Sequence, residues 1–403
     1  MQQKLDGDNS FVGKDLFRLG FIINPVAGMG GKVGLHGTDG DLYQHAITLG
    51  AIPVAEFRAS VALASLYEIR EKFLIISPAG AMGHDAFESL GFNSETIPLH
   101  NRERTSAIDT KEATEFMLRS GVQLILFTGG DGTARDIHSV IGDQIPMVGI
   151  PAGVKMRSGV FAYSPQAAGD LVKSFIEAPL KTSIRQVEIL DVVNEFENRE
   201  DANSLWQSSH FFGTARAPFL REYLQSAKAT SSGQGDVGIN ELAREIAQGL
   251  DPSRLYLFGP GTTTHKIIEA QDLHIDVQGV DAVFNGQIVG KDLSESGILE
   301  LLQRFGGATL FLGVIGGQGF LLGRGNQQLS AKVIELVSPD NIVVLSSAEK
   351  IDKLFPAYLH ADLGDAEIEA LLQGYRQVLV APGRSTLCRI VVPNRSHETL
   401  LLI

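Results

Sequence analysis

The chain has 403 residues, of which 44% are hydrophobic and 20% are charged. This length suggests two domains rather than one, with enough residues for a core in each. The formal net charge of −13 excludes a protein that binds nucleic acid by bulk electrostatics, so a bound nucleotide would need local groups to hold it.

Two further features of the composition indicate a cytoplasmic protein. Cys388 is the single cysteine, which excludes an intramolecular disulfide and a cysteine-based zinc site. Residues 1–8 are polar, and no apolar run approaches the roughly 20 residues that span a bilayer. We therefore expect a soluble, cytoplasmic protein without a membrane or nucleic-acid partner.

The first predicted strand ends in a loop that is rich in glycine. Residues 19–23 are apolar, Asn24 and Pro25 break the run, and four glycines follow within ten residues. Ligands of open parallel sheets lie beyond the carboxyl ends of the strands, so this loop is expected to border a ligand site. We assign Asn24 and Gly28 to phosphate binding, whereas the later glycines fit a loop without a ligand equally well.

Strand and helix patterns alternate over the first part of the chain. Residues 73–77 repeat the apolar run, and a turn at 78–83 leads into a helix expected over residues 84–90. A further helix is expected from the N-cap Ser164 and the first helical residue Pro165 to about residue 176. This alternation predicts βαβ units and a Rossmann-like parallel sheet.

A second glycine-rich turn joins a strand to a helix. Residues 124–127 are continuously apolar, as in a parallel strand buried on both faces, and Gly-Gly-Asp-Gly-Thr follows at 129–133. Apolar residues at Ile137, Val140 and Ile141 predict a helix that begins near Ala134. Such a turn directs unpaired backbone N–H groups and a helix dipole at its ligand, which favours a phosphate. Its predicted phosphate-binding residues are Gly129, Gly130, Gly132 and Thr133.

Asp131 places a carboxylate in the middle of this anion-favouring turn. A negative charge beside phosphates is unfavourable unless the carboxylate accepts a proton from an attacking hydroxyl, orients that hydroxyl or holds a metal ion. Glycine and aspartate are also common in ordinary turns, which is the plain structural alternative. The coincidence of strand, turn and helix favours the catalytic interpretation of Asp131.

The next loop carries two cations. Residues 147–150 predict a strand, and the loop that follows contains Lys155 and Arg157. We assign Lys155 to the neutralisation of charge on a transferred phosphoryl group. For Arg157, a solvated loop charge is an almost equally good interpretation.

Beyond Lys181 the pattern changes to short strands and hairpins. Asn285 and Gly286 between two apolar runs, for example, are a strong signal for a two-residue β-hairpin turn. We therefore predict an α/β protein with an α/β domain over residues 1–180 and a strand-rich, β-sandwich-like domain over residues 181–403. A return of the C-terminal segment to the first domain is left open.

The second domain contains a second predicted phosphate site. An apolar strand at 255–258 leads into Gly-Pro-Gly-Thr-Thr-Thr at 259–264 and a helix near His265. An N-cap role explains one threonine but not three, so we assign the turn to nucleotide binding. Its predicted ligand-binding residues are Gly261, Thr262, Thr263 and Thr264. Arg324 and Asn326 lie in a later glycine-rich segment and suit hydrogen bonding to ribose or phosphate.

Several segments together resemble a known family. Residues 21–25 and 129–133 resemble the first strand and the Gly-Gly-Asp-Gly-Thr signature shared by NAD kinases and diacylglycerol-type lipid kinases. Residues 149–155, 259–266 and 316–328 are similar to segments of the ATP-NAD kinase and acetoin-catabolism protein X branch of the NAD kinase family. These segments span most of the chain. Together they are specific for this family, whereas any one of them alone would be weak evidence.

The resemblance implies an NAD kinase-like fold and a phosphotransferase. The implied reaction moves a phosphoryl group from ATP, or from polyphosphate, to the ribose 2′-hydroxyl of NAD and gives NADP, with Asp131 as the catalytic residue and Mg²⁺ accompanying ATP. The Asn-acidic pair with which NAD kinases hold the dinucleotide corresponds to Asn194 and Glu195, and Asp191 lies just before it. We expect nucleotide ligands and a homo-oligomer, either a dimer or a tetramer.

Two alternatives stay open from the sequence. A kinase of the same fold could phosphorylate a lipid or another small alcohol, since the residues around Asn194 and Glu195 differ from the usual context of that pair. A nucleotide-binding regulator that has lost turnover is the second alternative. The intact Asp131 argues against the regulator without excluding it.

Overall fold

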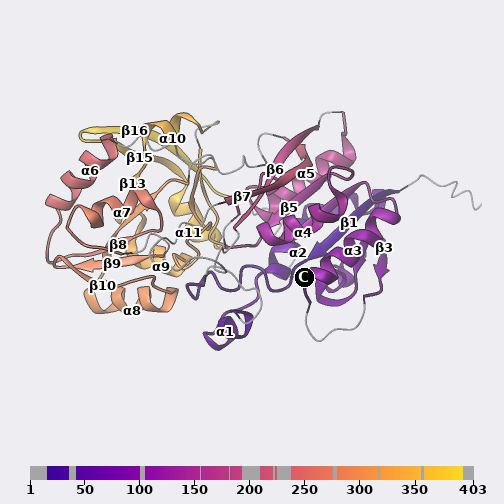
Figure 1. Ribbon diagram of the computed structural model, residues 1–403, viewed down its shortest axis with the longest axis horizontal. Coiled ribbons are helices and arrows are strands. Elements are labelled where there is room, and N and C mark those ends of the chain that lie inside the picture. Colours follow the sequence, from indigo (N-terminus) through magenta and orange to yellow (C-terminus); the bar gives the residue numbers. More distant parts are fainter. Residues whose placement is uncertain are drawn as a thin grey trace, which may run out of the picture.

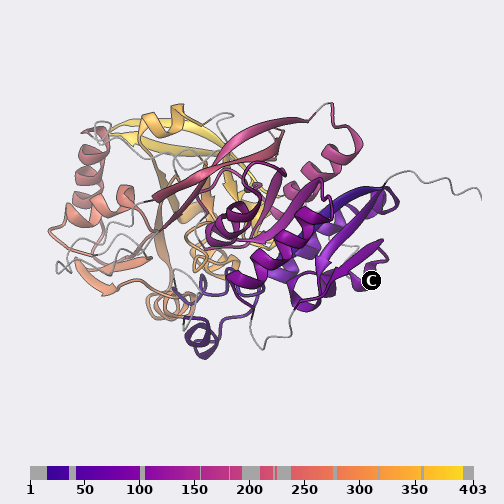
Figure 2. The same ribbon diagram turned by 45° about the vertical axis from the view of Figure 1, so that its right-hand side comes forward.

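The computed structural model describes residues 16–35, 42–99, 105–154, 156–180, 182–192, 209–220, 223–224, 237–275, 279–315, 318–354 and 358–393. These residues form two lobes that lie side by side in both views, each built around its own sheet (Figure 1, Figure 2). Within the described residues no helix is both long and apolar enough to cross a bilayer.

The first lobe is built on a five-stranded sheet in the order β3-β2-β1-β4-β5, with all neighbours parallel. Its strands are β1 (Phe17–Ile23), β2 (Phe73–Pro78), β3 (Ser94–Ile97), β4 (Leu124–Gly129) and β5 (Met147–Pro151). Its helices are α1 (Leu42–Thr48), α2 (Ala55–Ala64), α3 (Ala107–Arg119), α4 (Asp131–Ile141) and α5 (Pro165–Glu177), with the 3₁₀ turn η1 (Tyr67–Lys72) before β2. The predicted parallel α/β fold of this lobe is confirmed.

Helices cover both faces of this sheet, which explains why its strands are continuously apolar. Along β1 the side chains alternate: Leu19 and Phe21 join the cluster under α2 and α5, whereas Ile22 joins the cluster under α3 and α4. Ser164 caps α5 by accepting a hydrogen bond from the N–H of Ala167, as the Ser-Pro pattern predicts. The carboxyl ends of all five strands consequently meet at one edge of the sheet.

The prediction of a single helix over residues 84–90 is wrong. This segment consists of two separate 3₁₀ turns, η3 (His84–Ala86) and η4 (Glu88–Leu90), and a further turn, η2 (Gly80–Met82), precedes it. Phe87 interrupts them with a φ of −136° because its ring is buried against Phe21 at a centroid distance of 5.9 Å. A tertiary contact has therefore overridden the local helical pattern.

An antiparallel pair follows the first sheet in the chain and packs on the first lobe. It consists of β6 (Ser183–Val192) and β7 (Ser209–Phe219), with Ile189 and Ala215 in the core cluster under α4. The division of the chain into domains at residue 180 stays a prediction.

The second lobe is a mixed nine-stranded sheet in the order β10-β9-β8-β11-β13-β15-β16-β14-β12. Its strands are β8 (Leu255–Phe258), β9 (Asp281–Phe284), β10 (Gln287–Gly290), β11 (Ala308–Gly313), β12 (Phe320–Leu322), β13 (Ile342–Leu345), β14 (Tyr358–Ala361), β15 (Gly374–Ala381) and β16 (Arg384–Val391). The strand-rich second part of the fold is thus confirmed as a mixed sheet. The hairpin signal is confirmed too, because Asn285 and Gly286 join β9 to β10 with φ values of 50° and 67°.

At the centre of this sheet β8, β11, β13 and β15 run parallel, so their carboxyl ends also share one edge. The helices are α6 (Val237–Gln248), α7 (Thr262–Glu269), α8 (Glu295–Phe305), α9 (Ala331–Val337), α10 (Ala348–Asp352) and α11 (Ala366–Leu372), with η5 (Pro339–Asn341) before β13. Side chains of α6 and α7 pack on Phe258 and Phe311, and those of α8 and α9 pack on Leu257 and Leu310.

The two lobes are joined by a polar and aromatic interface. The loop after β1 extends toward the second lobe, where the carbonyl of Lys32 accepts a hydrogen bond of 2.9 Å from the N–H of Glu295 (Figure 1). Tyr163 from the first lobe stacks on His360 from β14 at a centroid distance of 4.0 Å. Arg58 of α2 forms an ion pair with Asp362, which lies just beyond β14.

Asp362 is expected to stabilise this interface strongly. This residue is 6% exposed and faces two cations, Arg58 and the 3% exposed Arg324. Burial lowers the pKa of Arg324 to about 9, and the charge of Asp362 opposes this decrease. Replacement Asp362→Asn leaves the buried Arg324 and the part-buried Arg58 without their carboxylate, so we expect a loss of about 3 kcal/mol in the free energy of unfolding, the lower end for a buried ion pair.

The matched control is Asp352→Asn, because Asp352 is exposed on α10. Urea titration of the wild type and of both variants checks the expectation. Equal unfolding midpoints for the two variants would show that the ion pair contributes nothing measurable.

Candidate functional site

Asp131 is the first residue of α4, and its carboxylate turns toward the loop that follows β5. Its Oδ1 accepts hydrogen bonds from the N–H groups of Arg157 and Ser158, both at 3.0 Å, and from the hydroxyl of Ser158 at 2.7 Å. The N–H of Arg157 is shared with Oδ2, which lies 2.8 Å from the nitrogen. The sequence predicted a helix start near Ala134, but the helix begins at Asp131, where a carboxylate also complements the dipole.

The surroundings of Asp131 bring its pKa close to neutrality. The side chain is 6% exposed, and burial raises the pKa of Asp131 from 3.8 to about 6. Hydrogen bonds from Ser158 and Arg157 oppose this rise, and the nearby charge of Asp191 adds to it. A carboxyl group with a pKa near the working pH is well suited to accept a proton from a substrate hydroxyl.

The glycines of the turn allow two backbones to touch. A Cβ on Gly130 would lie 3.2 Å from the Cα of Gly153, and a Cβ on Gly153 would lie 2.6 Å from the Cα of Gly130. Gly129 is also crowded, because a Cβ there would lie 2.5 Å from the Oγ1 of Thr133. Its carbonyl accepts a hydrogen bond of 3.0 Å from the N–H of Gly153. The turn after β4 and the loop after β5 therefore form one backbone cradle.

The loop after β1 joins the same cradle, as the sequence predicted from the shared sheet edge. Asn24 donates a hydrogen bond of 3.0 Å from its Nδ2 to the Oγ1 of Thr133. Gly28 has a φ of 79°, and a Cβ there would lie 1.9 Å from the carbonyl oxygen of Ala152. The structure thus brings Asn24, Gly28 and the Gly-Gly-Asp-Gly-Thr turn together.

Asp191 of β6 also lies at the start of α4. Its Oδ2 accepts a hydrogen bond of 2.7 Å from Arg135 and would lie 3.8 Å from a Cβ on Gly132. Lys155, Asn194 and Glu195 lie outside the described residues, so their assigned roles stay predictions.

From the second lobe, the segment 318–328 reaches the loop after β5. The Nε2 of Gln327 lies 3.2 Å from the carbonyl oxygen of Gly153 and 3.0 Å from that of Val154. Arg324 donates a hydrogen bond of 2.7 Å to the carbonyl of Ala162. Asn326 braces its own loop, since its Nδ2 donates to the carbonyl of Leu321 at 2.9 Å. Arg324 and Asn326 are therefore engaged with protein atoms, and their binding of ribose or phosphate stays a prediction.

The turn at 259–264 lies at the parallel edge of the second sheet. Gly261 precedes α7 with a φ of 123°, and the hydroxyl of Thr264 lies 2.6 Å from the carbonyl oxygen of Gly259. The ammonium of Lys350 donates to the Oγ1 of Thr263 at 3.2 Å. Lys350 was not predicted as a site residue from the sequence, although its place just after the strand at 342–345 was a usable signal. The assignment of this turn, including Thr262, to nucleotide binding stays a prediction.

A metal ion bound directly by protein carboxylates does not fit the start of α4. The carboxylate of Asp131 is bonded to the 157–158 backbone, and Asp191 is paired with Arg135. Asp136 is paired with Arg135 and Lys111 at 3.6 and 3.7 Å. The ligand atoms that Mg²⁺ prefers are therefore committed to protein donors in this arrangement.

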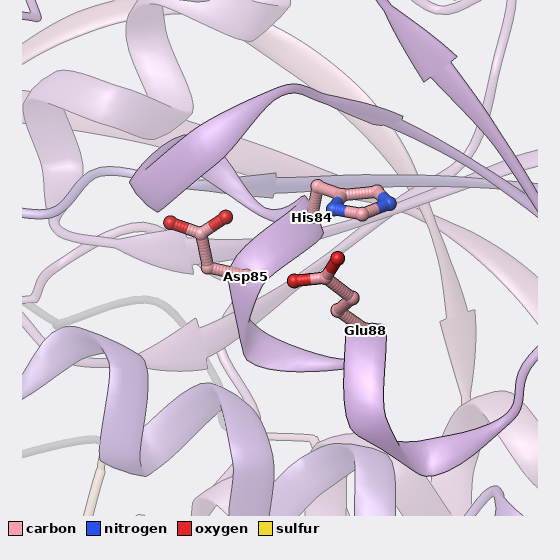
Figure 3. Close-up of side chains that lie close together, drawn as sticks. All are labelled: His84, Asp85 and Glu88. Carbon is pink, nitrogen blue, oxygen red and sulfur yellow. The ribbon is translucent and has the colours of Figure 1, made fainter.

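Another group of side chains could hold a cation at the end of β2. One ligand atom each from His84, Asp85 and Glu88 can lie within 4.8 Å of the others (Figure 3). His84 is half-buried beside Phe87, and both carboxylates are exposed. Exposed acidic groups of this kind are common without a metal ion, so we assign no function to them.

The chain is an α/β protein with a glycine cradle at one edge of its first sheet, and comparison with known families identifies its class. The profile of the ATP-NAD kinase N-terminal domain matches residues 19–179, and that of the ATP-NAD kinase C-terminal domain matches residues 254–390. The chain therefore belongs to the ATP-NAD kinase family and is a phosphotransferase of that family. The presence of both domains is consistent with phosphorylation of NAD to NADP, with ATP and NAD as the substrates that the family implies. No significant match is found among the curated proteins.

Replacement Asp131→Asn is expected to change how stability depends on pH. Because the pKa of Asp131 is higher in the folded protein, at about 6, than its ordinary value of 3.8, folding takes up a proton between these values. The proton bound by Asp131 therefore adds to the free energy of unfolding below about pH 3.8, and this contribution is lost as the pH rises through about 6. The Asn variant should therefore gain about 2 kcal/mol relative to the wild type between about pH 4 and pH 7.

Chemical denaturation across this pH range measures the gain. Asp143→Asn serves as the control, because Asp143 is exposed in the turn after α4. A constant difference between Asp131→Asn and the wild type at every pH would contradict the raised pKa.

Proposed function

We propose that this protein transfers the γ-phosphoryl group of ATP to the ribose 2′-hydroxyl of NAD, with Asp131 as the acceptor of the hydroxyl proton. One observation carries the proposal: a nine-tenths buried carboxyl group with a pKa of about 6 lies at the first turn of a helix that follows a glycine cradle. The family match supports the substrates, and the position of Asp131 supports its role.

The proposed chemistry is a single in-line displacement. The 2′-oxygen forms a bond to the γ-phosphorus while the bond from that phosphorus to the oxygen of ADP breaks, and the hydroxyl proton passes to Asp131. A ribose hydroxyl is a poor nucleophile at neutral pH, so a positioned base is useful. The carboxylate of Asp131 can take the proton at Oδ2, because fewer hydrogen bonds reach Oδ2 than Oδ1.

Phosphate binding is proposed for two turns. In the first lobe, the cradle formed by Asn24, Gly28 and the Gly-Gly-Asp-Gly-Thr turn presents backbone N–H groups, and Lys155 would add a positive charge. In the second lobe, the start of α7 with Gly261 and Thr262–Thr264 is the second proposed phosphate contact, with the ammonium of Lys350 beside Thr263. Mg²⁺ is proposed to arrive with ATP, held mainly by the phosphates. A homo-oligomer, dimer or tetramer, stays a prediction.

One observation favours a second candidate function. The carboxylate of Asp131 is already bonded to the backbone of residues 157 and 158, which a purely structural role would also require. A nucleotide-binding regulator without turnover is therefore the alternative. Measured turnover separates the two functions.

Incubation of the protein with ATP, Mg²⁺ and NAD is expected to yield NADP and ADP, identified by chromatography. Replacement Asp131→Asn keeps the size of the side chain and should lower kcat by about 10²–10⁴, the usual contribution of a positioned acid or base. Nucleotide binding, measured by calorimetry, should remain within about threefold of the wild type, since uncharged Asn still occupies the turn.

Asp143→Asn is again the matched control and should leave kcat unchanged. Binding of NAD without any NADP in the wild type would favour the regulator. ADP release in the presence of a different alcohol, but not of NAD, would assign another acceptor to the same chemistry.

A further inference from the structure

Gln318 approaches the carboxylate of Asp131 through a single peptide group. Its Nε2 donates a hydrogen bond of 2.9 Å to the carbonyl oxygen of Met156. The same peptide unit carries the N–H of Arg157, which contacts both carboxylate oxygens of Asp131 at 3.0 and 2.8 Å. One amide side chain from the second lobe is thus linked to the proposed base by one planar group.

The geometry of Gln318 is itself closely constrained. The residue is 4% exposed. The next residue, Gly319, has a φ of 70°, and its carbonyl accepts a hydrogen bond of 2.8 Å from the N–H of His360 on β14. A Cβ on Gly319 would lie 2.6 Å from the carbonyl oxygen of Tyr358, so the backbone here fits closely against β14. The backbone next to Gln318 is therefore packed and hydrogen-bonded against β14.

We infer that Gln318 is a positioning residue for Asp131: it orients the peptide between Met156 and Arg157 so that its N–H points at the carboxylate. This inference rests on the proposed catalytic role of Asp131. A peptide plane is fixed when both its carbonyl and its N–H are bonded, and a donor to the carbonyl also polarises the N–H toward its acceptor. Gln318 in the second lobe thereby influences the basicity of the Asp131 carboxylate in the first lobe.

Other charges also act on Asp131, and replacement of Gln318 leaves the residues that carry them unchanged. Arg157 on the loop after β5 and Arg324 from the second lobe are the cations, and Asp191 of β6 is the anion. On its own helix, Asp136 and Arg135 pair with each other. A change in the titration of Asp131 after replacement of Gln318 is thus assigned to the lost peptide contact.

The test is the pH profile of Gln318→Met, which keeps the length of the side chain and removes the donor. A weaker N–H contact stabilises the ionised carboxylate less, so the pKa of Asp131 should rise by about half to one unit. Below the midpoint of the acidic limb kcat/KM should fall roughly three- to tenfold, and above about pH 8 it should match the wild type.

A second readout does not depend on turnover. Denaturation across the pH range gives the free energy of unfolding of the wild type and of Gln318→Met, each with and without Asp131→Asn. Within each background, the effect of Asp131→Asn on this free energy changes with pH. The midpoint of that change should lie at a higher pH in the Gln318→Met background. Gln377→Met is the matched control, since Gln377 is exposed on β15 and bonds Ser385. It should shift neither midpoint.

The outcomes separate the two proposals. If Gln318→Met shifts the midpoint of the stability change but the wild type makes no NADP, the positioning role is supported and the proposed function is overturned. A folded Gln318→Met protein with unshifted midpoints, or with kcat/KM lowered equally at every pH, overturns the positioning role while leaving the proposed function intact.

Discussion

The interaction on which this structure most depends is the contact between a buried carboxylate and two backbone N–H groups. Asp131 is nearly enclosed, and the peptide groups of Arg157 and Ser158 supply the hydrogen bonds that make an ionised carboxylate tolerable there. The balance leaves a pKa of about 6, between that of a solvated carboxyl group and that of a buried acid without donors. A small displacement of the 157–158 backbone would therefore alter the charge at the start of α4.

The second lobe matters to the site because it holds that backbone. Side chains of Gln318, Arg324 and Gln327 all donate to carbonyl oxygens of the loop after β5, which lies between the sheets. Loop carbonyls at a buried interface require such partners, since water is excluded there. The interface between the lobes and the proposed catalytic geometry consequently share the loop after β5.

Both lobes share one structural arrangement at the edge of their sheets. In each sheet a run of parallel strands brings glycine-rich or hydroxyl-bearing turns to one edge, followed by helix starts that favour anions. In the first sheet this edge gathers Asn24, Gly130 and the loop at 151–158. In the second it gathers Thr263 and Lys350, which come from the ends of different strands.

The sequence by itself determined most of the local elements and singled out the candidate site. Its apolar runs predicted β1, β4, β5 and β8, its Asn-Gly pair predicted the hairpin, and its Gly-Gly-Asp-Gly-Thr motif singled out Asp131, because these signals arise from neighbouring residues. Tertiary structure decided the rest. Phe87 broke the expected helix by packing in the core, and the pKa of Asp131 depends on residues 26 and 27 positions away. Gln318 lies 162 positions from its partner, so only the folded chain could place it beside the proposed base.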